Sequence, residues 1–356
     1  MKKIIAIALS VLLIISLLPM AAFAGGTKEE VQAKIAATRD ALYGNKTGFA
    51  ANESLDFLLY LMAGGDADRY ADDYFAAIRD AFDAGQMTTA DRIALLINVC
   101  AYTGEDADNF KLNDDSTVNL YDLMKEKGTE VDSPYNYYYV ILSSPDDAYV
   151  EEITAAMAAN YTPGSGYNYW GFGTDNTANF AATMHFNGKY REMVDDAFNV
   201  IESAKTDKGY YYLADYGTDA NANSTASALF AFSEMEEPEK ADAAYDLLKN
   251  FELGDGNYFY MDNDKSANTF ATRDALRALL AYDAFLGEPE EPEEPVEEPE
   301  DTVDEQTPET TATAAKTAAQ EQSTPATGDS LIACGVAGIA MLALGIAVAT
   351  RKKEEK

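Results

Sequence analysis

The sequence has few of the residues that most often build disulfides, metal sites and nucleophilic centres. It contains two cysteines and one histidine, His185. Cys334 lies inside a C-terminal apolar run, so a folded domain keeps only Cys100 and cannot form an intramolecular disulfide. Zinc sites need several Cys, His or Asp ligands, and Cys100 and His185 lie far apart in separate apolar segments. We therefore expect no disulfide and no metal site of this kind.

Basic residues are also scarce. The chain has 26 Lys and Arg against 61 Asp and Glu, a formal net charge of −35. So acidic a surface repels the phosphates of nucleic acids and the headgroups of anionic lipids. We expect no nucleic-acid partner, whereas cations and basic or neutral ligands remain compatible with this charge.

The N-terminus has the pattern of a secretory signal peptide. Lys2 and Lys3 precede an apolar run from Ile4 to Leu18, and small residues follow at Ala22 and Ala24. Signal peptidase accepts small side chains at these two positions. The pattern predicts that residues 1–24 are removed by cleavage after Ala24 and that the chain is exported.

A second apolar run, from Leu331 to Thr350, is long enough to span a membrane and is followed by a short basic tail. The segment before it resembles a sortase sorting signal of the form Leu-Pro-x-Thr-Gly, with a threonine in place of the leucine: Thr324, Pro325, Ala326, Thr327 and Gly328. The resemblance implies that residues 324–356 are a sorting signal. A sortase transpeptidase would cut after Thr327 and join the chain to peptidoglycan of a Gram-positive cell wall. The alternative is a surface protein retained by its C-terminal membrane helix.

Between the two ends, composition separates a folded domain from a spacer. Residues 287–323 are rich in Glu, Pro and Thr, which predicts an extended, disordered, wall-spanning linker. Residues 25–286 suffice for one large domain, in which apolar residues recur at helical spacing and no run of alternating strands is found. The fold class expected is all-α. Helices are predicted at 28–42, 54–62, 67–84, 89–102, 118–127, 148–160, 178–186, 191–204, 225–234, 240–251 and 272–285.

The second half of this domain contains an internal repeat. The aromatic turns at Gly209 and Gly256 lie 47 residues apart, and a matching helix segment begins 16 residues after each, at Thr225 and Thr272. A shorter copy runs from Gly166-Tyr167 to Thr177-Ala178. The unit is an aromatic turn, a helix with small residues and a second amphipathic helix.

This unit resembles the prenyltransferase and squalene-cyclase (terpenoid-cyclase) repeat, in the version found in clostridial surface proteins. The likeness covers roughly residues 67–286 and includes Thr89-Ala90 and Thr272-Arg273-Asp274-Ala275. It implies an α/α toroid of helical hairpins, with an inner ring of helices wrapped by an outer ring. Small residues such as Ala226 and Ala275 would allow the inner helices to approach one another closely.

Within the resemblance, Asp175 is the one acid candidate. Terpene-cyclising toroids protonate their substrate with the central aspartate of an Asp-x-Asp-Asp-Thr-Ala motif. The corresponding segment here, from Gly173 to Ala178, keeps only Asp175 and lacks the flanking carboxylates. Helix capping is the simpler role for this residue, and we assign no catalytic residue.

Two loops leave calcium open as a cofactor. The segments 262–264 and 113–116 each cluster hard oxygen ligands, although neither has the spacing of an EF-hand. Solvated turns are the simpler interpretation of both loops.

Aromatic residues recur in the repeat turns, and equivalent turns of a toroid lie on one rim. They could form a platform for a small molecule, a glycan or a protein, or they could pack the helix ends. The candidate rim residues are Tyr167, Tyr169, Trp170, Tyr210, Tyr211, Tyr258 and Tyr260.

Two functions remain open. The favoured one is a noncatalytic, surface-anchored binding module. The alternative is a surface enzyme that uses the toroid cleft, such as a polysaccharide lyase or a residual cyclase. Fold analogy alone does not decide between them.

Overall fold

The computed structural model describes residues 25–144, 146–213, 215 and 217–287. This part of the chain is mostly helical, as expected for an all-α protein. Its strands are short and form two antiparallel hairpins, in which Phe110 faces Val118 and Tyr161 faces Tyr167. The strands are β1 (Phe110–Lys111), β2 (Thr117–Val118), β3 (Tyr161–Thr162) and β4 (Gly166–Tyr167).

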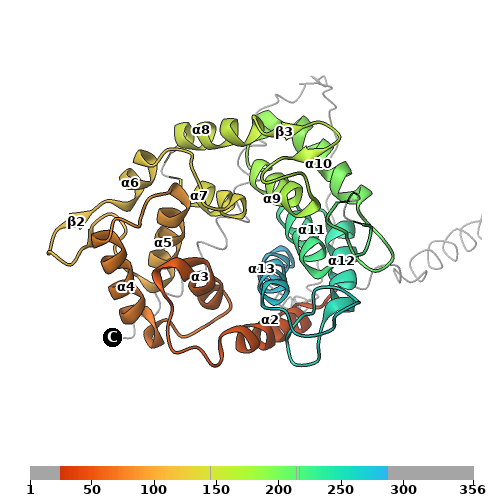
Figure 1. Ribbon diagram of the computed structural model, residues 1–356, viewed down its shortest axis with the longest axis horizontal. Helices are drawn as coiled ribbons and strands as arrows, with labels where there is room; N and C mark the ends of the chain where they lie inside the picture. The colour runs from red at the N-terminus through yellow and green to blue at the C-terminus, as the bar shows by residue number, and fades with distance from the viewer. Residues whose placement is uncertain (1–24, 145, 214, 216, 288–356) are drawn as a thin grey trace, which may run out of the picture.

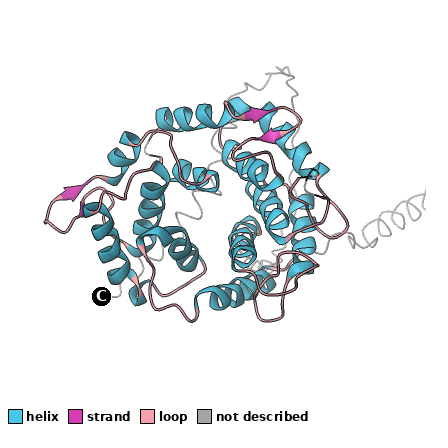
Figure 2. Ribbon diagram, in the orientation of Figure 1, coloured by secondary structure: helices cyan, strands magenta, loops and turns pink. Residues whose placement is uncertain are grey.

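Inner and outer helices alternate along the chain and form a ring around a central space (Figure 1, Figure 2). The outer helices are α2 (Lys28–Tyr43), α4 (Ala71–Asp83), α6 (Leu120–Glu126), α8 (Asp147–Ala158), α10 (Arg191–Ser203) and α12 (Pro238–Leu248). The inner helices are α3 (Ser54–Met62), α5 (Ala90–Thr103), α7 (Tyr137–Leu142), α9 (Thr174–Met184), α11 (Ala222–Glu234) and α13 (Thr269–Phe285).

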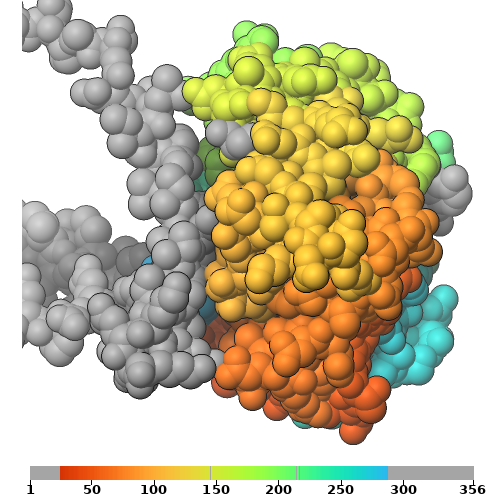
Figure 3. All heavy atoms as spheres, turned by 90° about the vertical axis from the view of Figure 1, so that its left-hand side faces the viewer, coloured from red at the N-terminus to blue at the C-terminus, as the bar shows by residue number. Residues whose placement is uncertain are grey.

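The ring is closed by contacts between its first and last hairpins. Each inner helix contacts the next one, and α13 contacts both α3 and α2. The Lys28 ammonium lies 3.1 Å from the Asp283 carboxylate, and the Tyr245 hydroxyl donates to Glu30 at 2.9 Å. Seen from the side, the segments that include α4 and α6 pack against each other without a gap between them (Figure 3).

Burial differs sharply between the two rings. On the inner helix α11, every residue except Asn223 is buried, and on the outer helix α10 only Val194, Ala197 and Ile201 are. An inner helix is covered by two inner neighbours and one outer helix, so small side chains are needed on most of its surface. Ala226 and Ala275, on the adjacent helices α11 and α13, are both fully buried, as the sequence predicted.

The internal repeat has one hydrogen bond in common. In each copy, a threonine hydroxyl in the first turns of an inner helix accepts from the backbone N–H of the turn tyrosine. The N···O distances are 3.2 Å for Tyr167 and Thr177, 2.9 Å for Tyr210 and Thr225, and 3.0 Å for Tyr258 and Thr272.

This close approach explains the glycine in the turn. A Cβ at Gly166 would lie 2.2 Å from the Thr177 hydroxyl, and one at Gly209 would lie 2.5 Å from that of Thr225. Gly166 also has a φ of +97°, a value that L side chains rarely adopt. The glycine, tyrosine and threonine therefore act as one structural unit that fixes the turn on its helix.

Every predicted helix is present, and one helix was missed. The missed helix is α7, in a run of consecutive tyrosines where all residues but the last are buried, so no polar face reveals a helical period. The predicted start of 178 for α9 was wrong by four residues, and the starts of 225 and 272 for α11 and α13 were wrong by three. Their first turns are polar and precede the apolar pattern.

The expectations for the chain ends lie outside the described residues. These are the signal peptide 1–24, the linker beyond Gly287, the sorting pentapeptide 324–328 and the apolar run 331–350. Within the described residues, none of the helices is both long and apolar enough to cross a membrane.

Candidate functional site

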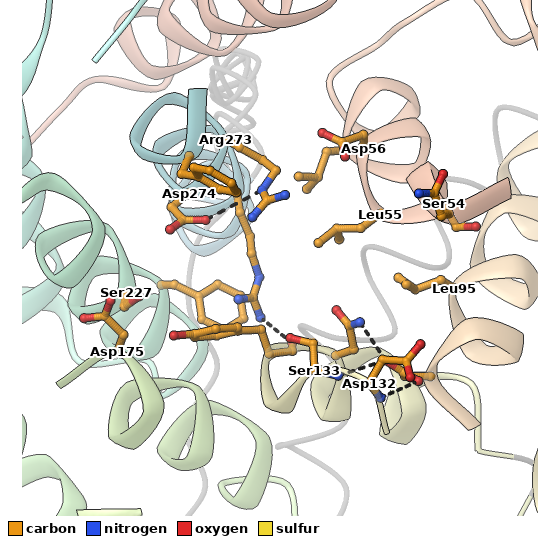
Figure 4. A pocket seen from close by; sticks show the side chains of 18 of the residues that line it. Ser54, Leu55, Asp56, Leu95, Asp132, Ser133, Asp175, Ser227, Arg273 and Asp274 are labelled. Atoms are coloured by element: carbon orange, nitrogen blue, oxygen red, sulfur yellow. Dashed lines mark hydrogen bonds and ion pairs between the residues drawn. The ribbon is translucent and has the colours of Figure 1, made fainter. Parts of the chain in front are cut away.

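A cavity of about 480 Å³ lies at the centre of the ring, at the N-terminal ends of the inner helices. Its walls come from the first turns of α3, α5, α9, α11 and α13 and from the segment before α7, which includes the 3-10 helix η3 (Pro134–Asn136). Residues further along α11 and α13, Phe230 and Arg277, also line it. Figure 4 shows that the lining side chains converge from several different helices. Because helix N-termini carry partial positive charge, they favour nearby carboxylates.

Charged groups of both signs line this cavity. Three arginines face it from α5 and α13: Arg92, Arg273 and Arg277. Five aspartates share the same walls: Asp56, Asp91, Asp132, Asp175 and Asp274. A site with charges of both signs suits a polar ligand better than an apolar one.

Asp175, in the first turn of α9, is an acid of the cavity wall whose pKa is strongly raised. It lies beside Ser227 in Figure 4, and its Oδ1 atom is buried without a hydrogen-bond partner among the described residues. Burial, reinforced by the negative charge of Asp274, raises the pKa of Asp175 to about 7, and a hydrogen bond with Ser224 opposes this shift. At neutral pH this carboxyl group therefore stays protonated to a larger extent than an ordinary aspartate.

Asp274 is the second acid with a shifted pKa. Its carboxylate accepts from the Asn223 amide at 2.6 Å and lies 3.9 Å from Arg273, too far for a hydrogen bond. Burial raises the pKa of Asp274, with a smaller contribution from Asp56, although Arg273 and Arg277 counteract this. Two acids that both hold protons more tightly than usual thus share one cavity.

Arg277 forms part of the cavity floor. Its guanidinium stacks on the Phe230 ring at 3.9 Å and donates to the Asn179 side-chain oxygen at 2.5 Å and to the Tyr135 carbonyl at 3.3 Å. Its Nε atom is buried without a partner in the described part of the chain. The guanidinium is anchored by these contacts, and its Nε–H donor is unused.

Asp91 has a structural role in the wall. Its carboxylate accepts from the backbone N–H of Asp132 at 3.1 Å and of Ser133 at 3.3 Å, and from the Asn136 amide at 2.8 Å. These bonds fix the loop before α7 against α5. They also orient Asn136, whose side-chain oxygen has no hydrogen-bond partner among the described residues.

Unsatisfied polar atoms are concentrated at this cavity. Buried polar groups in folded proteins are nearly all hydrogen-bonded, so exceptions need an explanation. Of the eight buried side-chain atoms without a hydrogen-bond partner in the described residues, four belong to residues that line the cavity. They are Asn136 Oδ1, Asp175 Oδ1, Asn223 Oδ1 and Arg277 Nε.

The predicted aromatic rim is wrong for three of its members. Tyr167, Tyr210 and Tyr258 are at most 2% exposed, because each turn folds its tyrosine under the adjoining inner helix. The Tyr210 hydroxyl donates to Glu202 at 2.8 Å, and the Tyr167 ring stacks on Phe180 at 5.1 Å. These tyrosines cannot offer a ring face to a ligand.

The other rim candidates have different surroundings. Tyr169 and Tyr211 are half-buried, and their hydroxyls donate to the carbonyls of Val131 and Ser203 at 3.1 Å. Tyr260 is 40% exposed and Trp170 is 78% exposed.

The loops considered for calcium are filled by internal hydrogen bonds and ion pairs. Asp114 accepts from the backbone and hydroxyl of Ser116, and Asp262 pairs with Lys208 and Lys265. In the described part of the chain, no group of three or more acidic, His or Cys side chains could hold a metal ion. Burial raises the pKa of the Cys100 thiol, which keeps it protonated.

Sequence reasoning found Asp175 but missed its neighbours. Arg273, Arg277 and Asn223 lie in segments that were assigned to helix packing or to loops. A sequence signal existed, because charged and amide residues stand at the start of alanine-rich inner helices, where a purely structural helix would be apolar.

No protein family matches the chain, and no curated protein matches it in sequence.

Proposed function

We propose that the chain is a surface-displayed α/α toroid of the prenyltransferase and squalene-cyclase type whose central cavity binds a saccharide. The alternation of inner and outer helices and the shared glycine, tyrosine and threonine unit support the toroid. The observation that carries the binding function is the set of four buried, unpaired polar atoms at the cavity wall.

The chemistry of these four atoms indicates the ligand class. Asn136, Asp175 and Asn223 each present an oxygen acceptor, and Arg277 presents a donor. A sugar hydroxyl both donates and accepts, so a polyol offers partners for acceptors and donors alike. An apolar isoprenoid would leave them unpaired and would bury charges without compensation, which is costly.

A binding screen tests this proposal. The full-length chain, purified in mild detergent, is applied to an array of bacterial and animal glycans, and hits are measured by thermal shift and calorimetry. Saturable binding is expected, and Asn223→Ala should weaken it about tenfold, because a hydrogen bond to a charged or buried site contributes ~1.5 kcal/mol.

The matched control for the cavity acid is Asp72. Asp72 and Asp175 both lie in the first turn of a helix, but Asp72 is exposed on the outer helix α4. Asp175→Asn should weaken saccharide binding, whereas Asp72→Asn should not. Equal affinity of both variants and the parent would contradict binding in the cavity.

A second candidate function is glycan hydrolysis or elimination at the same site. The observation in its favour is the carboxyl of Asp175, whose pKa is raised to about 7 beside a second acid, Asp274. A carboxylic acid that remains protonated near neutral pH can donate a proton to a leaving glycosidic oxygen. Such an acid is too weak to protonate an alkene, so a residual cyclase is disfavoured.

Product formation distinguishes the enzyme from the binding module. If Asp175 is a general acid, kcat/KM should fall above about pH 7 as it loses its proton. Asp175→Asn should then abolish turnover. Saturable binding without products at any pH would establish the noncatalytic module.

We also propose that the ring is displayed outside the cell through the two ends of the chain. Cleavage after Ala24 and sortase transfer at Thr327 would leave it attached to peptidoglycan. Muralytic digestion of intact cells should release the chain with Gly25 at its N-terminus and a peptidoglycan fragment on Thr327. Recovery in the detergent-soluble membrane fraction with residues 331–350 still attached would instead establish membrane anchoring.

A further inference from the structure

Three large apolar side chains stand out on the surface of the described residues. Trp170 is 78% exposed, Phe270 is 64% exposed and Tyr260 is 40% exposed. Trp170 lies in the turn before α9, and Phe270 is in the first turn of α13. The Tyr260 carbonyl accepts from Ala222, the first residue of α11. All three therefore lie at the N-terminal ends of successive inner helices, the same end that opens the cavity.

Trp170 is held in an unusual backbone conformation. Its φ is +55°, in the left-handed region that bulky residues seldom occupy. The Asn176 amide donates to the carbonyls on both sides of it, Tyr169 at 2.8 Å and Gly171 at 2.9 Å. Strain of this kind persists only where the surroundings impose it, and it is concentrated at ligand sites.

The scaffold that holds Trp170 is continuous with the cavity wall. Asn176 follows Asp175 in the first turn of α9. The indole packs edge-on against Tyr169 at 4.8 Å, and the Tyr169 hydroxyl donates to Val131, next to the cavity residue Asp132. Phe270 lines the cavity itself. Thus one turn of α9 positions both a buried acid and an exposed indole.

We propose that Trp170 is an outer subsite for a linear oligosaccharide, one end of which occupies the cavity. This inference rests on the proposed saccharide-binding function. A pyranose has an apolar C–H face that stacks on an aromatic ring, while its hydroxyls stay in water. Cavities of roughly 300–1,000 Å³ hold drug-sized molecules, so this one takes a few sugar units. The units that follow pass over Phe270 or Trp170 at the mouth.

A glycan fits these aromatic residues better than a protein partner does. Protein interfaces combine a contiguous apolar patch with a polar rim. Here one exposed aromatic residue, Phe270, lines a cavity whose walls carry charges and unpaired acceptors, and Trp170 is held by Asn176, the neighbour of the cavity residue Asp175. This arrangement suits a chain of alternating apolar faces and hydroxyls.

The protein contains a built-in reporter for this subsite, because Trp170 is the only tryptophan in the sequence. The full-length chain in mild detergent is titrated with β-1,4-glucan, chitin and hyaluronan oligosaccharides, each from disaccharide to octasaccharide. Indole fluorescence and calorimetry are followed together. Longer oligosaccharides should bind more tightly than the disaccharide and should shift the fluorescence, whereas a disaccharide bound within the cavity should leave the fluorescence nearly unchanged.

Variants separate the subsite from the cavity. Trp170→Ala should weaken binding of the hexasaccharide about tenfold and leave binding of the disaccharide unchanged. Trp170→Phe should retain most of the affinity for the hexasaccharide. The control is Tyr190→Ala, in the 3-10 helix η4 (Gly188–Tyr190) between α9 and α10 and half-buried; it should change neither affinity.

The outcomes of these experiments distinguish the outer subsite at Trp170 from saccharide binding in the cavity. Equal loss at all lengths, or no loss, on Trp170→Ala would overturn the outer subsite and leave saccharide binding in the cavity intact. Binding of a protein partner that depends on Trp170, together with saccharide binding that does not, would also overturn it. Absence of binding to all three oligosaccharide series and to the glycan array would overturn both proposals.

Discussion

The aromatic residues of the repeat turns fall into two sets with opposite surroundings. Tyr167, Tyr210 and Tyr258 come one or two residues after the turn glycines and are buried, whereas Trp170, in the turn before α9, and Phe270, in the first turn of α13, are exposed. In the sequence the two sets look alike. In the structure the first set seals the repeat turns, whereas in the second set Phe270 lines the cavity and Trp170 lies in the turn before the cavity helix α9.

The difference follows from what the backbone of each residue does. The buried tyrosines donate their N–H groups to threonines of the inner helices, so their side chains are directed into the core. Trp170 lies in a left-handed turn that is held by Asn176, and its side chain points out of the core. The aromatic content of a turn therefore does not by itself indicate binding. The hydrogen bonds of the turn decide whether its aromatic side chains are buried or exposed.

The largest effect on stability is expected from truncating a buried tyrosine. Tyr210→Ala should lower the free energy of unfolding by about 3–5 kcal/mol, because it leaves a cavity in the core. Tyr211→Ala, which removes the half-buried neighbour, should cost less than about 1 kcal/mol. Chemical denaturation measures both, and equal costs would contradict the division into two sets.

A smaller loss is expected when the repeat hydrogen bond is removed. Thr225→Val takes away the acceptor of the buried Tyr210 N–H and should cost about 2 kcal/mol. Thr183 is equally buried, but its hydroxyl donates to a carbonyl of its own helix, so Thr183→Val leaves no N–H group unpaired. Denaturation midpoints should show a clear loss of stability in Thr225→Val and at most a small loss in Thr183→Val.

Substitution of the cavity acid Asp175 should stabilise the fold at neutral pH. Its folded pKa of about 7 exceeds the ordinary value of 3.8, so the folded chain binds this proton more tightly than the unfolded chain. The resulting stability is present below about pH 4 and is lost as the pH rises through 7. Asp175→Asn should therefore gain about 1–2 kcal/mol at pH 8 and little at pH 4, after allowance for water in the cavity.

The pH dependence should not vanish completely in this variant. Glu234 is buried near Tyr138, and burial raises its pKa to about 7 as well. Unfolding curves between pH 4 and pH 8 test the sign of the effect, and a stability difference between Asp175→Asn and the parent that does not grow with pH would contradict it.

The smallest effect on stability is expected at the exposed set. Trp170→Ala should change the free energy of unfolding by less than about 0.5 kcal/mol. Trp170→Gly should raise it by about 0.5–1 kcal/mol, because glycine adopts a φ of +55° without strain. Thermal unfolding checks both values. A large loss in either variant would place Trp170 with the structural tyrosines.

The helical architecture was accessible from the sequence because amphipathic periodicity reports which residues face a core. Periodicity did not predict the helix or its first residue in two kinds of segment. The tyrosine-rich helix α7 is buried on nearly all sides and has no polar face, and the first turns of α9, α11 and α13 face a polar cavity instead of the core. Asp175, Asn223 and Phe270 of the candidate site lie in those first turns, whereas Arg277 lies two turns further along α13 and Asn136 lies before α7.

The sequence by itself determined the predominantly helical composition, the repeat unit and the acidic surface, since these depend on local spacing and on counts of charges. Only the tertiary structure decided which aromatic residues are exposed and which polar residues meet. Asp56, Asp175 and Asp274 are separated by about a hundred residues each, and closure of the ring through α13 and α3 brings them to one cavity. Burial within that cavity then shifts the pKa of Asp175, because desolvation disfavours a carboxylate wherever the chain has enclosed it.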